Sequence, residues 1–552
     1  KVDGVLFKQM LKMLSLDFIC NYDSLILKDT KKINKLAFAL DMAVAGRSDE
    51  SVWIRQAQEI RKQMTDSLID SAFTYLPEGV KHDEIELIKR KLKRRRLELE
   101  AVASQYYRLL QRTPVVAGTN QSDYFLIERQ APDRTVLRIY DPETGDCRLE
   151  QQFSGKETKE LWLYGLAGND TFEVKGNTRK DFPIYLISGE GENQYQLNHN
   201  RKIHVYDKDY KYDYQKIKYH KISFTPWGIY DSDKGISLGT FFTYTMYGFK
   251  RAPFTYQHRI GYNYLKGFMY AGIFPNYDGR RRLYLNASIS SPRNFENFFG
   301  FGNNTAGYKE EKKNYNRVKL RTYMFNPSFE MDLRKEEVVT FFGSLDMYKA
   351  KRTDDRYIYT VYGEDHPIFR TNYFVGLGAT YRITKQPYSW LPLLETEWTA
   401  GWKMNLKKPE RNFPYAQGSL SWNVRFSDRF TWASLMKGTV LFDNDYEFYQ
   451  AATIDLRGFR DNRFIGKQSF YQYSDLRLDM GKLKKPFTPL KYGLFAGFDY
   501  GRVWFPGERS HCWHTSYGGG IWLTFLNKFT TKYSWFGSTD SFRFAFELGL
   551  GF

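Results

Sequence analysis

Two short segments near the C-terminal end carry the residues best suited to one strong polar interaction. Leu456-Arg457-Gly458-Phe459 lies in a loop-like stretch, and Phe498-Asp499-Tyr500-Gly501 follows on an alternating segment. A buried guanidinium needs a carboxylate that accepts its planar fork of donors. Asp499 is therefore the expected partner of Arg457 if the loop folds back into the interior of the protein. Such a pair would hold the loop in place without making or breaking a covalent bond.

Other kinds of chemistry find no support in the residue pattern. The sequence has no nucleophile elbow, no paired metal carboxylates and no zinc spacing. Its three cysteines, Cys20, Cys147 and Cys512, lie far apart, and an oxidising compartment would permit one disulfide without requiring it. We therefore expect no enzyme activity, no catalytic residue, no cofactor and no metal ligand within these 552 residues.

The composition indicates which kind of element positions the polar pair. Aromatic residues make up 18% of the chain, with 42 Tyr, 44 Phe and 42 Gly, while the mean hydropathy is only −0.58. No stretch approaches the ~20 apolar residues that a membrane helix needs. A strand of a membrane barrel is apolar on one face only, so its average hydropathy looks soluble although its aromatic content is high. The composition is therefore typical of a transmembrane β-barrel.

Alternating segments from about residue 235 to the end predict the strands of that barrel. Residues 254–264, 323–333 and 420–426 each place apolar or aromatic side chains on one face and small, polar or charged ones on the other, with His258 and Met324 as the exceptions. The strands run to ~10–14 residues, which is the membrane-barrel length, whereas strands of globular proteins are mostly ~5–6 residues long. We predict an all-β transmembrane barrel of about 16 antiparallel strands over residues 220–552.

The last strand of the sequence has the clearest pattern. Arg543, Ala545 and Glu547 face one way, and the other face carries the apolar residues Phe542, Phe544, Phe546, Leu548, Leu550 and Phe552. A free edge this apolar would aggregate unless it pairs with the first strand and faces lipid. The barrel is therefore expected to close between its first and last strands.

A helical region is predicted over residues 1–112. Apolar residues recur at helical spacing from Asp83 to Arg112, and a second helix is expected from Glu50 to Phe73, ending near Pro77. The basic run Lys93–Arg96 would suit lipid headgroups or nucleic acid, but a solvated helix face is the simpler reading of a short charge run.

A small β-domain, solenoid-like in its turns, is predicted over residues 113–219. The Pro/Gly/polar stretch Thr113–Ser122 marks its boundary with the helices. Two glycine turns, Gly165–Asp170 and Gly189–Asn193, precede short strands and suggest a repeated strand-turn unit. The first turn resembles calcium-binding nonapeptide repeats, but the second lacks the aspartate, so simple tight turns account better for both.

The pattern in the barrel resembles the BamA-like superfamily of outer-membrane assembly and translocation barrels, the bacterial surface antigen family. Members have sixteen strands, and a loop inside the lumen carries a [V/I/L]-R-G-[F/Y] motif whose arginine meets the aspartate of an F-x-D-x-G strand. Leu456, Arg457, Gly458 and Phe459 match the first motif, and Asp499 and Gly501 match the second. Phe498 departs from the pattern, because it directly precedes the aspartate. The resemblance covers residues 220–552 and identifies Phe552 as a terminal aromatic assembly signal, with Leu550, Leu548 and Phe546 in the same strand.

The N-terminal part departs from the same family. Residues 1–218 show no repeat like the periplasmic POTRA modules of BamA-like proteins. They resemble instead a Bacteroidota branch in which a calcineurin-like metallophosphoesterase precedes a helical linker, a small β-domain and the barrel. The chain lacks the metal-binding motifs of that enzyme, so any such domain is expected upstream of Lys1.

These observations leave two functions open. The first is a role in, or accessory to, outer-membrane protein assembly or translocation, for which outer-membrane lipid, other assembly components and client barrels are the expected partners. The second is a membrane anchor that displays a metallophosphoesterase domain. Nucleic acid is not expected as a partner, because the residues behind the net charge of +19 are scattered along the chain. We expect the outer membrane as the location, with the N-terminal regions in the periplasm.

Overall fold

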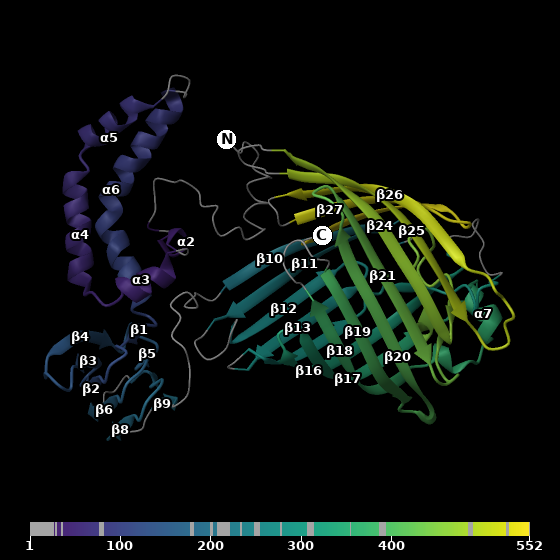
Figure 1. Ribbon diagram of the computed structural model, residues 1–552, viewed down its shortest axis with the longest axis horizontal. Helices are drawn as coiled ribbons and strands as arrows, with labels where there is room; N and C mark the ends of the chain where they lie inside the picture. Colours follow the sequence, from purple (N-terminus) through teal and green to yellow (C-terminus); the bar gives the residue numbers. More distant parts are fainter. Residues whose placement is uncertain are drawn as a thin grey trace. The chain divides into compact units, whose positions relative to one another are not determined.

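The computed structural model of the chain contains two compact units (Figure 1). One consists mainly of Lys221–Met246 and Phe254–Phe552, and the other mainly of Leu16–His220. The structure describes residues 27, 30–34, 37–76, 82–176, 181–198, 202–206, 221–231, 234–247, 254–276, 279–305, 314–353, 355–385, 393–483, 490–525 and 529–550.

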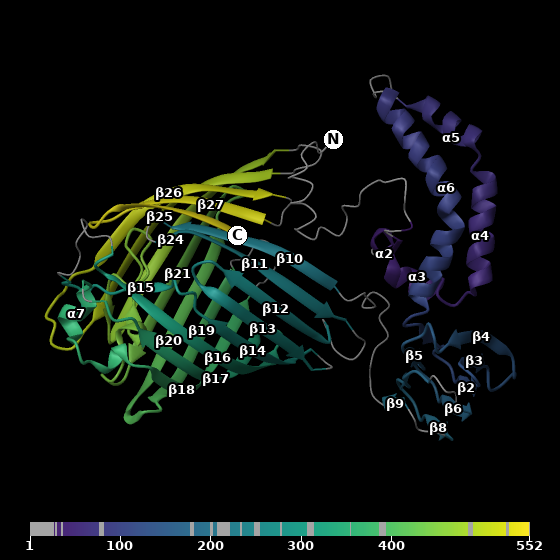
Figure 2. The same cartoon turned by 180° about the vertical axis from the view of Figure 1, so that it is seen from behind.

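The C-terminal unit is a closed antiparallel β-barrel (Figures 1 and 2). Apart from the three-residue β15 (Phe295–Asn297), sixteen described strands form its wall, each paired with the next in sequence, and the last pairs with the first. The wall strands are β10 Lys221–Asp231, β11 Gly235–Met246, β12 Tyr256–Asn263, β13 Gly267–Pro275, β14 Arg281–Ile289, β16 Arg317–Arg334, β17 Glu337–Ala350, β18 Asn372–Lys385, β19 Leu393–Asn405, β20 Lys408–Arg425, β21 Phe430–Leu441, β24 Gln468–Leu483, β25 Leu490–Trp504, β26 His514–Phe525, β27 Phe529–Gly537 and β28 Phe542–Leu550.

Strand alternation places apolar side chains on the outside of this barrel. Ile260 and Phe325 are exposed on the outer face, whereas Glu330 is buried in the lumen and binds Arg282 at 2.7 Å and Arg382 at 3.2 Å. An outer face of aromatic and aliphatic side chains is favourable only against lipid, and the lumen retains the charges. The prediction of a transmembrane β-barrel is therefore confirmed.

Three long connections pack against one another at one end of the barrel. Their described parts are residues 290–305 and 314–316, which contain β15, residues 351–353 and 355–371, which contain α7 (Tyr357–Tyr362), and residues 442–467, here named the plug loop. Phe298, Ile358 and Phe448, one from each connection, are buried in a common hydrophobic cluster. Burial of these side chains ties the plug loop to its neighbours at this end.

The helices of the N-terminal unit differ from the prediction in one respect. The predicted helix from Glu50 to Phe73 is two helices, α4 (Glu50–Gln63) and α5 (Asp66–Ala72), because Thr65 caps the second by accepting a hydrogen bond from the Leu68 amide at 3.1 Å. The following helix, α6, covers His82–Leu110.

The basic run on α6 is partly used within the unit. Lys93 pairs with Asp70 and Arg96 with Asp66, both at 2.8 Å, so these two side chains hold α5 against α6. None of the helices in the described ranges has both the length and the apolar character needed to cross a bilayer.

The β-part of the same unit consists of stacked parallel strands. One sheet contains β1 (Val115–Ala117), β5 (Leu161–Tyr164), β7 (Ile184–Ile187) and β9 (Ile203–Tyr206), all parallel. In the other, β2 (Tyr124–Gln130), β6 (Thr171–Gly176) and β8 (Gln194–Leu197) are parallel, with β3 (Arg134–Tyr140) and β4 (Cys147–Ser154) added antiparallel. The chain thus passes from one sheet to the other at three stacked turns.

The first of these three turns overlaps Thr113–Ser122, the stretch that the sequence predicts to be the boundary between the helices and the β-domain. Strand β1 precedes residues 118–123, which form a turn stacked on the two glycine turns of the sequence pattern. Gly168 and Gly191 have φ of 105° and 124°, and a side chain on either would meet the backbone of the preceding turn. Glycine is therefore required where successive turns touch.

Candidate functional site in the barrel lumen

The plug loop enters the lumen as a short hairpin. Its strands β22 (Ala452–Thr453) and β23 (Ile465–Gly466) pair antiparallel, and the segment between them carries the Leu456–Phe459 motif. The apolar side chains of this segment are buried against the wall in a cluster of Ile454, Leu456, Phe459, Phe464, Tyr471 and Val503. This burial fixes the backbone on either side of Arg457.

Arg457 binds two carboxylates on neighbouring wall strands. Its Nε lies 3.1 Å from both oxygens of Asp499 on β25, and its Nη2 also pairs with that carboxylate. Nη1 donates to Asp475 on β24 at 2.7 Å, and the backbone amide of Arg457 donates to Asp499 at 3.1 Å. The structure thus brings together the arginine and the aspartate that the sequence pairs.

The surroundings of this ion pair favour a permanent interaction. Asp499 is 0% exposed and also accepts a hydrogen bond from Ser516 on β26 at 2.8 Å. The guanidinium lies 3.9 Å from the ring centroid of Phe536 on β27, a cation–π contact. Because Arg457 and Asp499 are largely removed from water, loss of one charged partner would leave the other charge buried and uncompensated. Arg457 therefore contacts the wall strands β24, β25 and β27, and it is linked to β26 through Asp499.

Two glycines make room for this arrangement. A side chain on Gly458 would lie 2.6 Å from Ser516 Cβ and 2.9 Å from the Gly537 carbonyl oxygen, so the loop touches the wall there. A side chain on Gly497 would lie 2.7 Å from both Arg457 Nη2 and an Asp475 carboxylate oxygen. Gly497 stands two residues before Asp499, the position at which the resembled motif has its aromatic residue.

The aromatic residue of the sequence motif lies elsewhere. Phe498 is 49% exposed on the outer face, because neighbouring residues of a strand point to opposite sides. Gly501 lies on the same face as Asp499 and is packed against Tyr471. The sequence reasoning missed Asp475 and Phe536, although strand alternation on β24 and β27 would place both in the lumen.

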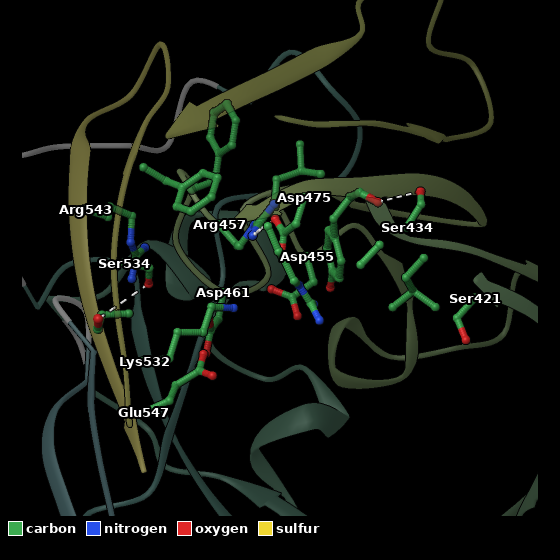
Figure 3. Close-up of a pocket in the computed structure, with 18 of the residues that line it drawn as sticks. Ser421, Ser434, Asp455, Arg457, Asp461, Asp475, Lys532, Ser534, Arg543 and Glu547 are labelled. Carbon is green, nitrogen blue, oxygen red and sulfur yellow. Dashed lines mark hydrogen bonds and ion pairs between the residues drawn. The ribbon is translucent and has the colours of Figure 1, made fainter. Parts of the chain in front are cut away.

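A cavity of about 470 Å³ lies beside the ion pair (Figure 3). Its charged lining residues are Asp455, Arg457, Asp461, Asp475, Arg477, Lys532, Arg543 and Glu547. Four acidic and four basic groups balance, so the lining does not select an anion or a cation. The cavity is therefore polar and carries no excess of one charge.

The junction between the first and last strands is the shortest in the part of the wall that the structure describes. The described residues that join β10 to β28 form three pairs, namely Ile229–Glu547, Tyr230–Phe546 and Asp231–Ala545. Among the described residues, every other junction of neighbouring wall strands has at least seven pairs. We call the β10–β28 junction the seam.

The terminal strand has the expected faces where its side chains are described. Phe542 is 71% exposed on the outer face, and Arg543 is buried in the lumen. Phe546 pairs with Tyr230 across the seam. Phe552 lies outside the described residues, as do the side chains of Leu548 and Leu550.

The turn considered for calcium uses its side chains to bind the adjacent turns. Asp170 accepts a hydrogen bond from the Asp123 amide, and Asn193 accepts one from the Asp170 amide, both at 2.9 Å. Asn169 accepts from the Glu192 amide at 2.9 Å. Within the described ranges, no three His, Cys, Asp or Glu side chains are grouped as metal ligands.

Asp170 should make the stability of the N-terminal unit depend on pH. Burial raises the pKa of Asp170 from 3.8 to about 7. The folded unit therefore holds a proton that the unfolded chain has released, and the free energy of unfolding should fall by about 2–4 kcal/mol between pH ~4 and ~7. Asp170→Asn should remove this fall, as measured by hydrogen exchange of β2, β6 and β8 corrected for intrinsic rates. The exposed Asp146→Asn is the control, and an unchanged pH profile in Asp170→Asn would contradict the assignment.

Comparisons with known proteins give structural likeness only. No family model matches the sequence, and no curated protein matches it. The chain aligns with BamA from Haemophilus ducreyi lacking POTRA domains 1–3 at 11% identity and a TM-score of 0.44, over 60% of this chain and 71% of that one. It aligns with CdiB from Escherichia coli at 10% identity and a TM-score of 0.38, over 59% and 62% of the two chains. It aligns with CdiB from Acinetobacter baumannii at 11% identity and a TM-score of 0.37, over 61% of this chain and 66% of that one.

Proposed function

We propose that this chain is an outer-membrane barrel of the BamA-like superfamily that acts in, or is accessory to, the assembly or translocation of outer-membrane proteins. The observation that carries the proposal is the seam, which three residue pairs close while the lumen is plugged by a loop locked through Arg457. A plugged lumen argues against a passive pore. A wall with one short junction supports a route between the barrel and the lipid.

The physical basis of the route is strand pairing. In β10, residues 222–228 pair with β11, and the pairing with described residues of β28 covers residues 229–231. Where a strand edge has no neighbouring strand, lipid cannot satisfy its backbone N–H and C=O groups. A strand of a client protein would satisfy these groups by adding to the edge. No bond chemistry is required, because pairing and burial in lipid supply the driving force.

A disulfide across the seam tests the proposal. Tyr230 and Phe546 are directly opposite, so Tyr230→Cys with Phe546→Cys should lock β10 to β28 under oxidation. We expect the locked barrel to lose insertion of client barrels into proteoliposomes and to regain it with reductant. The control is Trp535→Cys with Phe544→Cys, a directly opposite pair on β27 and β28 that leaves the seam free.

The same disulfide experiment distinguishes the assembly role from the alternative function, a membrane anchor. A membrane anchor for a metallophosphoesterase domain, as in the Bacteroidota branch, would need no mobile seam. If the locked barrel leaves client insertion and the amounts of other outer-membrane proteins unchanged, the anchor replaces the assembly role.

Removing Phe552 tests the role of the terminal residue as an assembly signal. We expect the deletion to lower the amount of this barrel in the outer membrane severalfold while leaving synthesis unchanged, as measured by membrane fractionation and immunoblotting. Phe552→Trp, which keeps an aromatic residue at this position, is the matched control. Normal insertion after removal of Phe552 would show that the terminal aromatic is not read as a signal.

A further inference from the structure

The tip of the plug loop contacts both strand turns that flank the seam. Lys234, in the turn between β10 and β11, lies 2.6 Å from the Asp461 carboxylate. In the turn between β27 and β28, Ser538 Oγ donates to the Gly458 carbonyl at 2.7 Å, and Asp540 pairs with Arg463. A loop segment of six residues, 458–463, therefore spans the two sides of the junction.

These contacts lie at the end of the seam where its strand pairing is found. Asp231, which directly precedes the turn that contains Lys234, pairs with Ala545, shortly after the turn that contains Asp540. The three pairs of the seam and the loop contacts thus share one end of the junction. The loop itself is fixed to β24 and β25 through Arg457, so it provides a rigid support for both turns.

We propose that the plug-loop tip is a seam clamp, in which Asp461 and Arg463 hold the β10–β11 and β27–β28 hairpins together and release of Lys234 from Asp461 loosens the hold on β10. This inference rests on the proposed function, since it assigns the control of the same seam.

The two sides of the seam clamp differ in strength. The side chains of Arg463 and Asp540 are 9% and 15% exposed, and Arg463 also binds Thr305 and lies 5.1 Å from the ring centroid of Phe299. The side chains of Lys234 and Asp461 are 28% and 40% exposed, so water and salt screen their attraction. The β10 side is therefore the side that opens.

Opening on this side does not require the loop to leave the lumen. Asp461 and Asn462 also contact β15. The Asn297 side chain donates to the Asp461 carbonyl, and the Asn462 side chain donates to Glu296, each at 3.1 Å. These hydrogen bonds do not involve the β10–β11 turn. Loss of the Lys234–Asp461 ion pair thus weakens the hold of the plug loop on the β10–β11 hairpin, while the loop keeps its contacts with β15.

Cysteine cross-linking across the seam tests the clamp. The Tyr230→Cys, Phe546→Cys pair is placed in a background with Cys20, Cys147 and Cys512 changed to serine, and the purified full chain is studied in lipid nanodiscs. The rate of disulfide formation under mild oxidation reports the closed population. In this parent, the rate should fall about threefold between ~0.05 and ~0.5 M NaCl, as a screened ion pair predicts.

Breaking the ion pair should reproduce the effect of salt. Lys234→Gln and Asp461→Asn should each form the disulfide slowly at both salt concentrations. The charge exchange Lys234→Asp with Asp461→Lys should restore the faster rate at low salt. Lys403→Gln is the matched control, because it breaks a 2.8 Å pair with Asp346 in the wall away from the seam, and its rate should equal that of the parent.

The outcomes separate the clamp from the proposed function. If Lys234→Gln and Asp461→Asn keep the parent's rate and salt dependence, the clamp is wrong, and loss of client insertion in the locked barrel still supports the assembly role. If the locked barrel inserts clients at the normal rate, the assembly role fails whatever the cross-linking rates.

Discussion

Changing Arg457 to alanine should remove most of the heat-resistant folded barrel. The change leaves Asp499 and Asp475 without the guanidinium that they share, in a place where Asp499 has no access to water. Breaking a buried ion pair from one side costs about 3–5 kcal/mol. We expect the folded band on semi-native gels to disappear at a clearly lower temperature, together with a lower amount of protein in the membrane.

Two further variants show whether the uncompensated carboxylate is the cause. Arg457→Lys keeps the charge but not the planar fork, so its loss should be intermediate. Adding Asp499→Asn to Arg457→Ala removes the stranded charge and should recover part of the folded band. Unchanged gel mobility and abundance in Arg457→Ala would mean that the pair does not hold the loop.

Changing Gly458 to alanine should weaken the same lock without removing any charge. The new Cβ would lie 2.6 Å from Ser516 Cβ and 2.9 Å from the Gly537 carbonyl oxygen, so the loop must move away from β26 and the β27–β28 turn. Overpacking of this kind costs about 1–3 kcal/mol. We expect a lower melting temperature of the folded band and faster proteolysis within residues 442–467.

A second glycine provides the control for this substitution. Gly438 lies on the wall strand β21, and an added Cβ would come no closer than 3.6 Å to the Ser469 carbonyl oxygen, an ordinary contact. Gly438→Ala should therefore behave as the parent protein. If both variants lose the same stability, the effect of Gly458→Ala reflects general intolerance of glycine replacement and not contact with the wall.

The barrel was predictable from the sequence because lipid imposes a pattern with a period of two residues. Ile260 and Phe325 had to face outward wherever their strands lay in the ring, so residue type alone assigned their side. The pairing of Arg457 with Asp499 was accessible for another reason, since a buried guanidinium requires a carboxylate and a short motif supplied one.

The remaining features depend on neighbours that the sequence does not identify. Phe536 and Asp475 meet Arg457 because of the order of strands around the ring, which a linear pattern does not contain. The break between α4 and α5 depends on the N-cap that Thr65 forms. The helical spacing of apolar residues continues across this break and therefore does not reveal it. Strand β1 was missed because its three residues are too few to show an alternation.

The position of the Arg457 partners also has a consequence for the order in which the barrel forms. Asp475 and Asp499 follow Arg457 by 18 and 42 residues, and Ser538 follows Gly458 by 80. Closing these loops costs less chain entropy than joining the two ends of the ring. We therefore expect the last strands and the plug to assemble before the β10–β28 junction closes the barrel.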